Sequence, residues 1–418
     1  MTTRADLPAR LTGRALMGAM LYVSLLDLVL LGSGRILQFG PLTLRMALYA
    51  AGLGLVLVQS LLRGSFDGEY AKLTLGFIAL VLLGSLMGAV TGAERAEIAE
   101  DVKPLLFFLN LFFFAAAIDS VDRVRSVASV IRVGASILAV VYLGVIGLMY
   151  AGILPFGILY AVASRSDEFF FRGQTGFFYK GFLYLGVGFL FFVFQPRLRD
   201  RMMAVALLVA IVFTFTRGLL LSAISIAGLA LLVRRRDLLS GAAAVGALLC
   251  LSLAAWPVFQ HSLADRETAD SMRLSDIGTI ARETTPVTVV VGRGFGALIG
   301  DRPRIEESYF EIFYKQGIPG LVFWLTVLVL LTRDFRAAIS RGRGQDALPF
   351  FLGALFVFLE SATNPFLTNP IGMSMVLVAL VSGRVLATSP GVVELPRSGR
   401  EPRRHTSMSI TTLTSPVE

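Results

Sequence analysis

Long uncharged stretches of apolar residues recur along almost the whole chain, and they restrict its fold more than any other feature. Stretches without Asp, Glu, Lys or Arg are 204–214, 218–233, 238–256, 317–332 and 350–358. A span of roughly 20 mostly apolar residues crosses the hydrocarbon of a bilayer. Lipid offers backbone groups no hydrogen-bond partners, and these stretches do not alternate as barrel strands would. Each is therefore predicted to be a helix.

The predicted fold class is an all-α, polytopic membrane protein with about twelve transmembrane helices. Charged residues make up only 16% of the 418, against about 25% in an ordinary soluble domain. The predicted helices are 15–33, 41–62, 71–92, 104–118, 127–151, 181–195, 202–216, 218–233, 238–257, 317–332, 348–361 and 370–388. They form a transmembrane domain, 1–388, followed by a tail, 389–418, whose Ser, Thr, Pro and Arg content predicts disorder.

The formal net charge of +9 is distributed in a pattern typical of membrane topology rather than of nucleic-acid binding. Basic clusters occupy every second loop: Arg63 and Lys72; Arg123, Arg125 and Arg132; Arg197, Arg199 and Arg201; Arg234 to Arg236; Arg333, Arg336, Arg341 and Arg343. The loops between them are poor in Lys and Arg, and the one at 94–103 is net acidic. The positive-inside rule then places both termini in the cytoplasm and disfavours nucleic acid as a partner.

Cysteine and histidine are too scarce for several kinds of site. Cys250 is the single cysteine, and His261 and His405 are the two histidines. An intramolecular disulfide and a cysteine- or histidine-rich metal centre are therefore excluded, and no metal site is predicted.

Two long outer loops, 152–180 and 258–316, carry cations that topology does not explain, because long loops escape the positive-inside rule. Arg217 is similar, since it lies between two spans on the outer side. An ionisable residue at membrane depth is a functional candidate. The alternative is that Arg217 extends to the lipid headgroups.

Three further segments of these loops are candidate binding or catalytic elements. Residues 168–180 (EFFFRGQTGFFYK) interleave aromatics with Arg172 and Lys180, which suits either sugar stacking and phosphate binding or an interfacial aromatic belt. Glu306 and Glu307 form either a general base with a shifted pKa or ordinary solvated ion pairs. The glycine-rich turn at 292–296 lacks the βαβ context of a nucleotide site but would let backbone approach a phosphate. Fixed cations beside carboxylates suit an anionic substrate at the outer leaflet.

On three of these stretches the chain resembles the O-antigen ligase and O-antigen polymerase superfamily of bacterial membrane glycosyltransferases. They are residues 216–221 (TRGLLL), 291–296 (VGRGFG), and 309–310 (YF) followed by 316–320 (QGIPG). Ligases of this superfamily carry a histidine three residues before the aromatic that aligns with Tyr309, whereas this chain has Glu306 there. The stretch 364–367 (NPFL) also looks polymerase-like. The resemblance therefore favours a polymerase over a ligase.

The resemblance implies the joining of undecaprenyl-pyrophosphate-linked repeat units on the outer face of the bacterial cytoplasmic membrane. Glu306 or Glu307 would be the catalytic base. The implied substrate-binding residues are Arg217, Arg273, Arg293, Arg172, Lys180 and Tyr309, with Arg217 and Arg273 on the pyrophosphate. It implies no cofactor, because the donor is already activated. Membrane lipid, a flippase and a chain-length regulator are the implied partners.

Two alternatives remain at this stage. A ligase would move finished glycan from undecaprenyl pyrophosphate to another acceptor. A secondary transporter would also suit twelve spans with both termini inside. Against the transporter, few ionisable residues lie near mid-membrane (Asp27, Arg45 and Glu360), and the hydropathy pattern shows no internal repeat.

Overall fold

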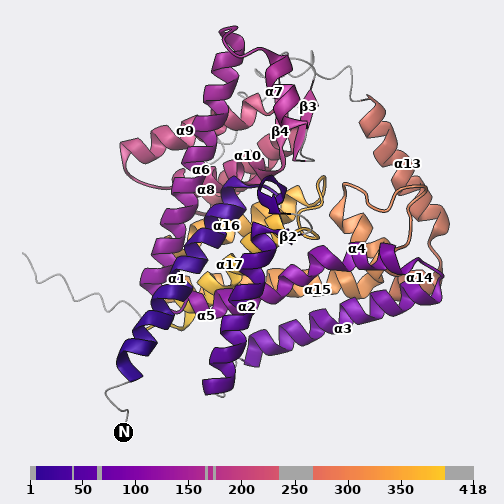
Figure 1. Cartoon of the computed structure of the whole chain (residues 1–418), viewed down its shortest axis with the longest axis horizontal. Helices are drawn as coiled ribbons and strands as arrows, with labels where there is room; N and C mark the ends of the chain where they lie inside the picture. The colour runs from indigo at the N-terminus through magenta and orange to yellow at the C-terminus, as the bar shows by residue number, and fades with distance from the viewer. Residues whose placement is uncertain are drawn as a thin grey trace, which may run out of the picture.

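The computed structural model describes residues 6–39, 42–63, 68–164, 168–172, 176–234 and 267–390. Within these ranges the chain is mostly helical, with two short antiparallel hairpins (Figure 1). The predicted span 238–257 lies outside the described residues, as does the predicted tail apart from its first two residues. The prediction of an all-α architecture is confirmed for the part that is described.

The described residues up to Phe192 contain eight α-helices, three 3₁₀ turns and two hairpins. The helices are α1 (Asp6–Leu30), α2 (Leu44–Arg63), α3 (Gly68–Val90), α4 (Arg95–Leu105), α5 (Asn110–Ala117), α6 (Val121–Tyr150), α7 (Phe156–Ala163) and α8 (Leu183–Phe192). The 3₁₀ turns are η1 (Arg35–Leu37), η2 (Leu106–Leu109) and η3 (Lys180–Phe182). One hairpin pairs β1 (Gln38–Phe39) with β2 (Leu42–Thr43), and the other pairs β3 (Phe169–Arg172) with β4 (Gly176–Tyr179).

The described second half is helical apart from its connecting loops. Its helices are α9 (Leu198–Phe213), α10 (Arg217–Arg234), α13 (Glu267–Glu283), α14 (Pro286–Val291), α15 (Ser308–Ser340), α16 (Gly344–Glu360) and α17 (Pro370–Thr388). In the view of Figure 1, α3 and α15 run side by side across the steeper α1, α2 and α6, and α13 lies at the edge of the molecule.

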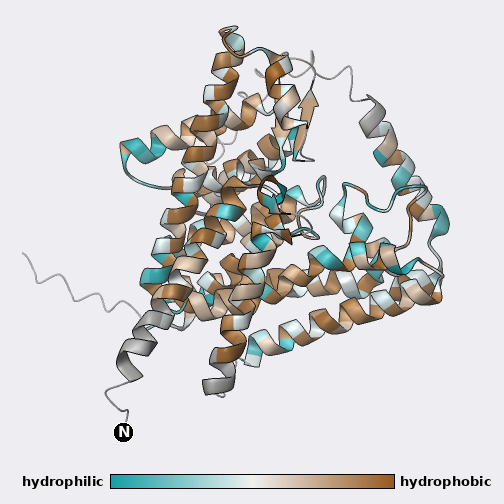
Figure 2. Cartoon of the chain, viewed as in Figure 1, coloured by the Kyte–Doolittle hydropathy of each residue, from teal (hydrophilic) through white to brown (hydrophobic). Residues whose placement is uncertain are grey.

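Four of the described helices, α3, α6, α15 and α17, are long and apolar enough to cross a membrane. Shorter apolar helical stretches are Ala15–Leu30, Leu44–Val58, Lys180–Phe192 and Arg217–Leu231. Apolar residues predominate along most of these helices (Figure 2). This pattern fits a multi-pass membrane protein, whereas the number of about twelve spans stays a prediction.

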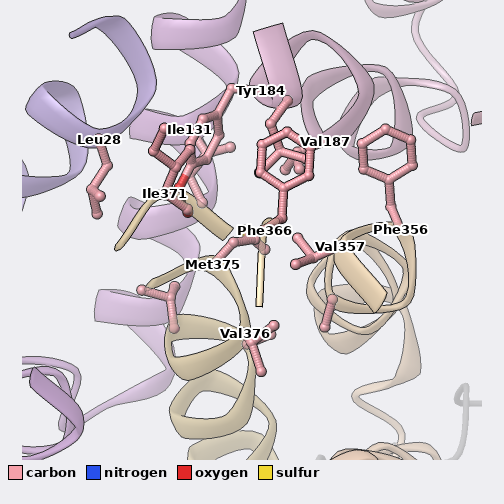
Figure 3. Packing of buried hydrophobic residues seen from close by; sticks show 14 of the residues in the cluster. Leu28, Ile131, Tyr184, Val187, Phe356, Val357, Phe366, Ile371, Met375 and Val376 are labelled. Carbon is pink, nitrogen blue, oxygen red and sulfur yellow. Dashed lines mark hydrogen bonds between the residues drawn. The ribbon is translucent and has the colours of Figure 1, made fainter. Parts of the chain in front are cut away.

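Helices α8 and α17 form the centre of the molecule. All ten residues of α8 are buried, and α17 is apolar and buried on nearly every side, as expected for a helix surrounded by others. Asn369 starts α17, because its Oδ1 accepts hydrogen bonds from the N–H groups of Ile371 and Gly372. Figure 3 shows side chains of α8, α16 and α17 interlocked around Phe366. Lipid is as apolar as these side chains, so close packing is what stabilises this centre.

At three places the structure adds to or corrects the local expectations from the sequence. The acidic segment predicted as a loop at 94–103 is mostly helix α4, because its Ala, Glu and Lys residues favour a polar surface helix. The described part of loop 258–316 contains α13 and α14. Helix α15 begins at Ser308 rather than 317, and it kinks at Gly317, where φ is 65°. The predicted start of that span therefore marks the kink.

Candidate functional site

The turn between α9 and α10 places Arg217 at the first position of α10. Phe215 in this turn has φ 51°, and it is the one non-glycine residue with positive φ in the described ranges. The turn is fixed by Thr216, whose N–H donates to Oγ1 of Thr214 at 3.2 Å, and by Tyr142, whose hydroxyl donates to the Phe213 carbonyl at 2.7 Å. Strained backbone of this kind concentrates at functional sites.

The start of α10 packs against the end of α16. A Cβ on Gly218 would lie 3.0 Å from Oγ1 of Thr363 and 3.4 Å from Oε1 of Glu360, so a larger residue would require these side chains to shift. Glu360 is fully buried, and its Oε2 accepts a hydrogen bond from Nδ2 of Asn364 at 3.1 Å. In the described ranges its Oε1 has no hydrogen-bond partner. A buried carboxylate thus lies against Gly218, the residue that follows Arg217 at the start of α10.

The start of α15 reaches the same turn from the other side. The Ser308 N–H donates to the Ser361 carbonyl at 3.0 Å, and the Ser308 hydroxyl donates to the Asn364 carbonyl at 2.9 Å. The hydroxyl of Tyr309 donates to the Phe358 carbonyl at 2.6 Å. The segments around Arg217 and Tyr309, far apart in sequence, therefore meet at residues 360–364. We call this meeting point the 360–364 turn.

The two candidate glutamates differ in their surroundings. The side chain of Glu306 is 57% exposed, whereas that of Glu307 is only 6% exposed. Arg273 of α13 contacts both, with Nη2 2.5 Å from Oε2 of Glu306 and Nε 3.1 Å from Oε1 of Glu307. The second contact lacks hydrogen-bond alignment, so neither oxygen of Glu307 has a hydrogen-bond partner in the described chain.

Burial raises the pKa of the Glu307 carboxyl, and the positive charge of Arg273 opposes that rise. A carboxylate with a raised pKa is a better proton acceptor at neutral pH than an exposed one. The surroundings of Glu307 are therefore those of a general base. The sequence alone did not decide between Glu306 and Glu307.

The glycine-rich turn at 292–296 uses its N–H groups inside the protein. Those of Arg293 and Gly294 donate to the carbonyls of Tyr314 and Lys315, at 2.8 and 3.0 Å. The N–H of Phe295 donates to the Gly84 carbonyl at 2.9 Å. The Arg293 guanidinium pairs with Glu283 and lies 5.5 Å from the centre of the Tyr314 ring. This turn thus joins the segment between α14 and α15 to α3 and α15, which is a structural use of the motif.

The hairpin β3–β4 carries Arg172 and Lys180. Arg172 pairs with Gly176 at the end of the hairpin where the two strands are connected, and Nζ of Lys180 lies 5.5 Å from the centre of the Phe170 ring. Buried Glu168 accepts hydrogen bonds from the N–H groups of Ser33, at 2.9 Å, and Arg35, at 3.2 Å. The hairpin is thereby fixed to the end of α1. Most of its aromatic rings pack on one another, and Phe170 remains exposed.

Sequence analysis named Glu360 only as a mid-membrane charge and missed its place in the site. Asn364 was noted for its resemblance to polymerases, without a role. The available signal was a glutamate at the end of an apolar stretch, followed closely by Asn364 and Pro365. That signal identifies a functional candidate but not the helices that it faces.

Comparison with known proteins gives one informative match. No protein-family model matches the chain. The chain is 28% identical, over 368 residues, to an O-antigen polymerase of Shigella flexneri, and the match covers 85% of this chain and 92% of that protein. This similarity confirms the resemblance to the O-antigen polymerase family that the short motifs indicated.

Proposed function

We propose that this chain is a glycosyltransferase of the O-antigen polymerase type, which joins undecaprenyl-pyrophosphate-linked oligosaccharide repeat units of a surface polysaccharide. One observation carries the proposal: the segments that carry Arg217 and the buried Glu307, far apart in sequence, meet at the 360–364 turn through their neighbours Gly218 and Ser308. The similarity to the Shigella protein supports the same class of reaction.

In the proposed reaction, a hydroxyl of one repeat unit attacks the anomeric carbon of another. The new glycosidic bond forms as the bond between that carbon and the pyrophosphate breaks, and undecaprenyl pyrophosphate leaves. Glu307 takes the proton of the attacking hydroxyl. Arg217 stabilises the charge that develops on the pyrophosphate.

Arg273 has two proposed roles in this reaction. It contacts both Glu306 and Glu307, and its positive charge favours the ionised form of the base. As a guanidinium beside the reacting groups, it is also a candidate ligand for the donor pyrophosphate. Arg293, Arg172, Lys180 and Tyr309 remain candidate contacts for the rest of the substrate.

The ion pairs support an outward-facing site with both termini in the cytoplasm. Arg125 pairs with Asp346, and Arg333 pairs with Glu69; the charge pattern assigns all four to the cytoplasmic side. Arg304 and Lys315 contact Asp101 among segments assigned to the outer side. The proposed location is therefore the outer face of the cytoplasmic membrane, where membrane lipid, a flippase and a chain-length regulator are the expected partners.

A deletion strain tests the proposal. Loss of a polymerase should leave single repeat units on the final acceptor, and the wild-type gene should restore long chains. The glycans on the acceptor and on undecaprenyl are separated by gel and lipid extraction. Full-length polymer retained on undecaprenyl would instead identify a ligase and overturn the polymerase proposal.

A further inference from the structure

A second polar cleft lies one helical turn beyond Glu307. It occupies the space between α4, the first part of α15 and the segment that leads into α17, with a volume of about 450 Å³ that includes space open to solvent. Its polar lining includes Asp101, Glu311, Lys315, Gln316, Thr368 and Asn369. Arg304 also lines it and is 46% exposed, so the cleft opens toward the surface of the outer loop.

The one buried cation of this cleft is fully engaged. Nζ of Lys315 donates to Oδ1 of Asp101 at 2.9 Å, to the carbonyl of Pro303 at 2.6 Å and to Oε1 of Glu311 at 3.1 Å. An ammonium group has three protons, so these bonds use all of them. Because Lys315 lies between two carboxylates, this part of the cleft does not suit a phosphate.

Glu311 carries the acceptor oxygen that a ligand in this cleft would contact. Its side chain is 7% exposed, and its Oε2 is buried without a hydrogen-bond partner among the residues that the structure describes. A buried carboxylate oxygen without a donor is unfavourable by itself. A ligand that brings hydroxyl donors would remove that cost.

We infer that this cleft is a subsite for a neutral, hydroxyl-rich sugar of the acceptor glycan, in which a sugar hydroxyl donates to Oε2 of Glu311. The N–H of Glu311 donates at 3.0 Å to the carbonyl of Glu307, the residue that caps the start of α15, so the two residues are one turn apart along the chain. The proposed sugar extends from Glu311 over this turn toward Glu307. The identity of that sugar as the acceptor rests on the proposed function.

The test measures binding separately from catalysis. Purified full-length protein in lipid nanodiscs is titrated with the repeat-unit oligosaccharide released from the strain's own polysaccharide, and affinity is measured by calorimetry. Glu311→Gln should weaken binding about tenfold or more, because a bond to a charged acceptor is lost. Thr368→Phe, which fills the cleft from its other side, should weaken binding to a similar degree. Glu100→Gln, an exposed carboxylate on α4, should leave affinity unchanged.

The same preparations are supplied with lipid-linked repeat units to measure polymer formation. Unchanged oligosaccharide affinity in both Glu311→Gln and Thr368→Phe, with folding verified by melting temperature, overturns the subsite even if wild-type protein makes polymer. Oligosaccharide binding that both variants weaken, together with no polymer from wild-type protein, upholds the cleft as a sugar site and overturns the proposed function.

Discussion

The two ends of α15 carry clusters of charges that are organised in opposite ways. At the later end, both carboxylate oxygens of Glu69 are paired, Oε1 with Arg333 at 2.5 Å and Oε2 with Arg384 at 2.7 Å. Asp334 pairs with Arg333 at 2.7 Å. Two cations and two anions thus hold α3, α15 and α17 together. We call this group the inner cluster.

At the early end of α15, carboxylate oxygens remain without hydrogen-bond partners. This holds for both oxygens of Glu307, for Oε2 of Glu311 and, in the adjoining turn, for Oε1 of Glu360, counting the described residues alone. Buried polar groups are normally satisfied, so these oxygens are candidates for contact with a ligand or a reacting group. The difference teaches that both ends contain ion pairs, but only the carboxylates at the early end keep acceptor oxygens without a hydrogen-bond donor in the described residues.

The largest expected effect is a difference in the rate of polymer formation between variants of two carboxylates, one at each end of α15. Glu307→Gln should lower the rate of polymer formation about 10²–10⁴-fold, because the proton acceptor is lost while size and shape are kept. Glu69→Gln in the inner cluster should leave the rate within about twofold of wild type. Turnover of lipid-linked repeat units by purified protein measures both. Equal losses in the two variants would contradict the distinction between the clusters.

A smaller loss is expected at Arg217. Arg217→Ala should lower the rate about 10²–10³-fold, as for the removal of one group that stabilises a developing negative charge. Arg217→Lys should recover part of this loss, because it restores the charge without the planar fork of donors. Arg125→Ala, which removes the pair with Asp346, is the matched control and should retain the rate. The idea fails if Arg217→Ala makes polymer at the wild-type rate.

A third prediction concerns how the rate of polymer formation depends on pH, and its direction follows from the raised pKa of Glu307. Burial raises the pKa of Glu307, so the rate should fall as pH drops through that raised value and a proton occupies the base. Arg273 lowers this pKa and Glu306 raises it. Arg273→Gln should therefore move the acid limb of the rate profile to higher pH, and Glu306→Gln should move it to lower pH. Shifts in the same direction would exclude Glu307 as the titrating base.

The smallest effect is expected within the inner cluster. Arg333 and Arg384 are 46% and 31% exposed, so solvent screens their pairs with Glu69. A double-mutant cycle of Glu69→Gln and Arg384→Ala should give a coupling energy of at most about 1 kcal/mol, measured by thermal unfolding in detergent. A coupling several times larger would show that this cluster is more than a partly solvated link between helices.

Much of the fold was predictable, because membrane spans follow from local composition. The ends of α2, α3, α16 and α17 lie within a few residues of the predicted spans. The kink at Gly317 was not predictable, since its conformation depends on α14 packing against it, with the carbonyl of Val290 where a Cβ on Gly317 would lie. The bounds of α13 and α14 were not predicted, because α13 is polar and α14 has only six residues, so neither has a clear hydropathy signal.

The candidate site, like the fold, could be predicted from the sequence only in part. The residue pattern singled out Arg217, Glu306 and Glu307, because charges that topology leaves unexplained can be identified one at a time. The family resemblance added Arg273. The sequence could not decide which of the two adjacent glutamates is the base. Adjacent residues have the same neighbours in the sequence, but these two side chains are buried to different extents. Nor could it assign Glu360 or Glu311 to a site, because their surroundings come from helices distant in the chain.

The amino-acid sequence by itself determined that this protein spans a membrane, which of its charges need an explanation, and the family that it resembles. These properties are local, since they depend on the residue types within each segment. Only the tertiary structure decided that the segments carrying Arg217 and Glu307 meet at the 360–364 turn, and which carboxylate oxygens lack a hydrogen-bond donor in the described residues. The physical reason is that burial and hydrogen bonding depend on which helices pack together.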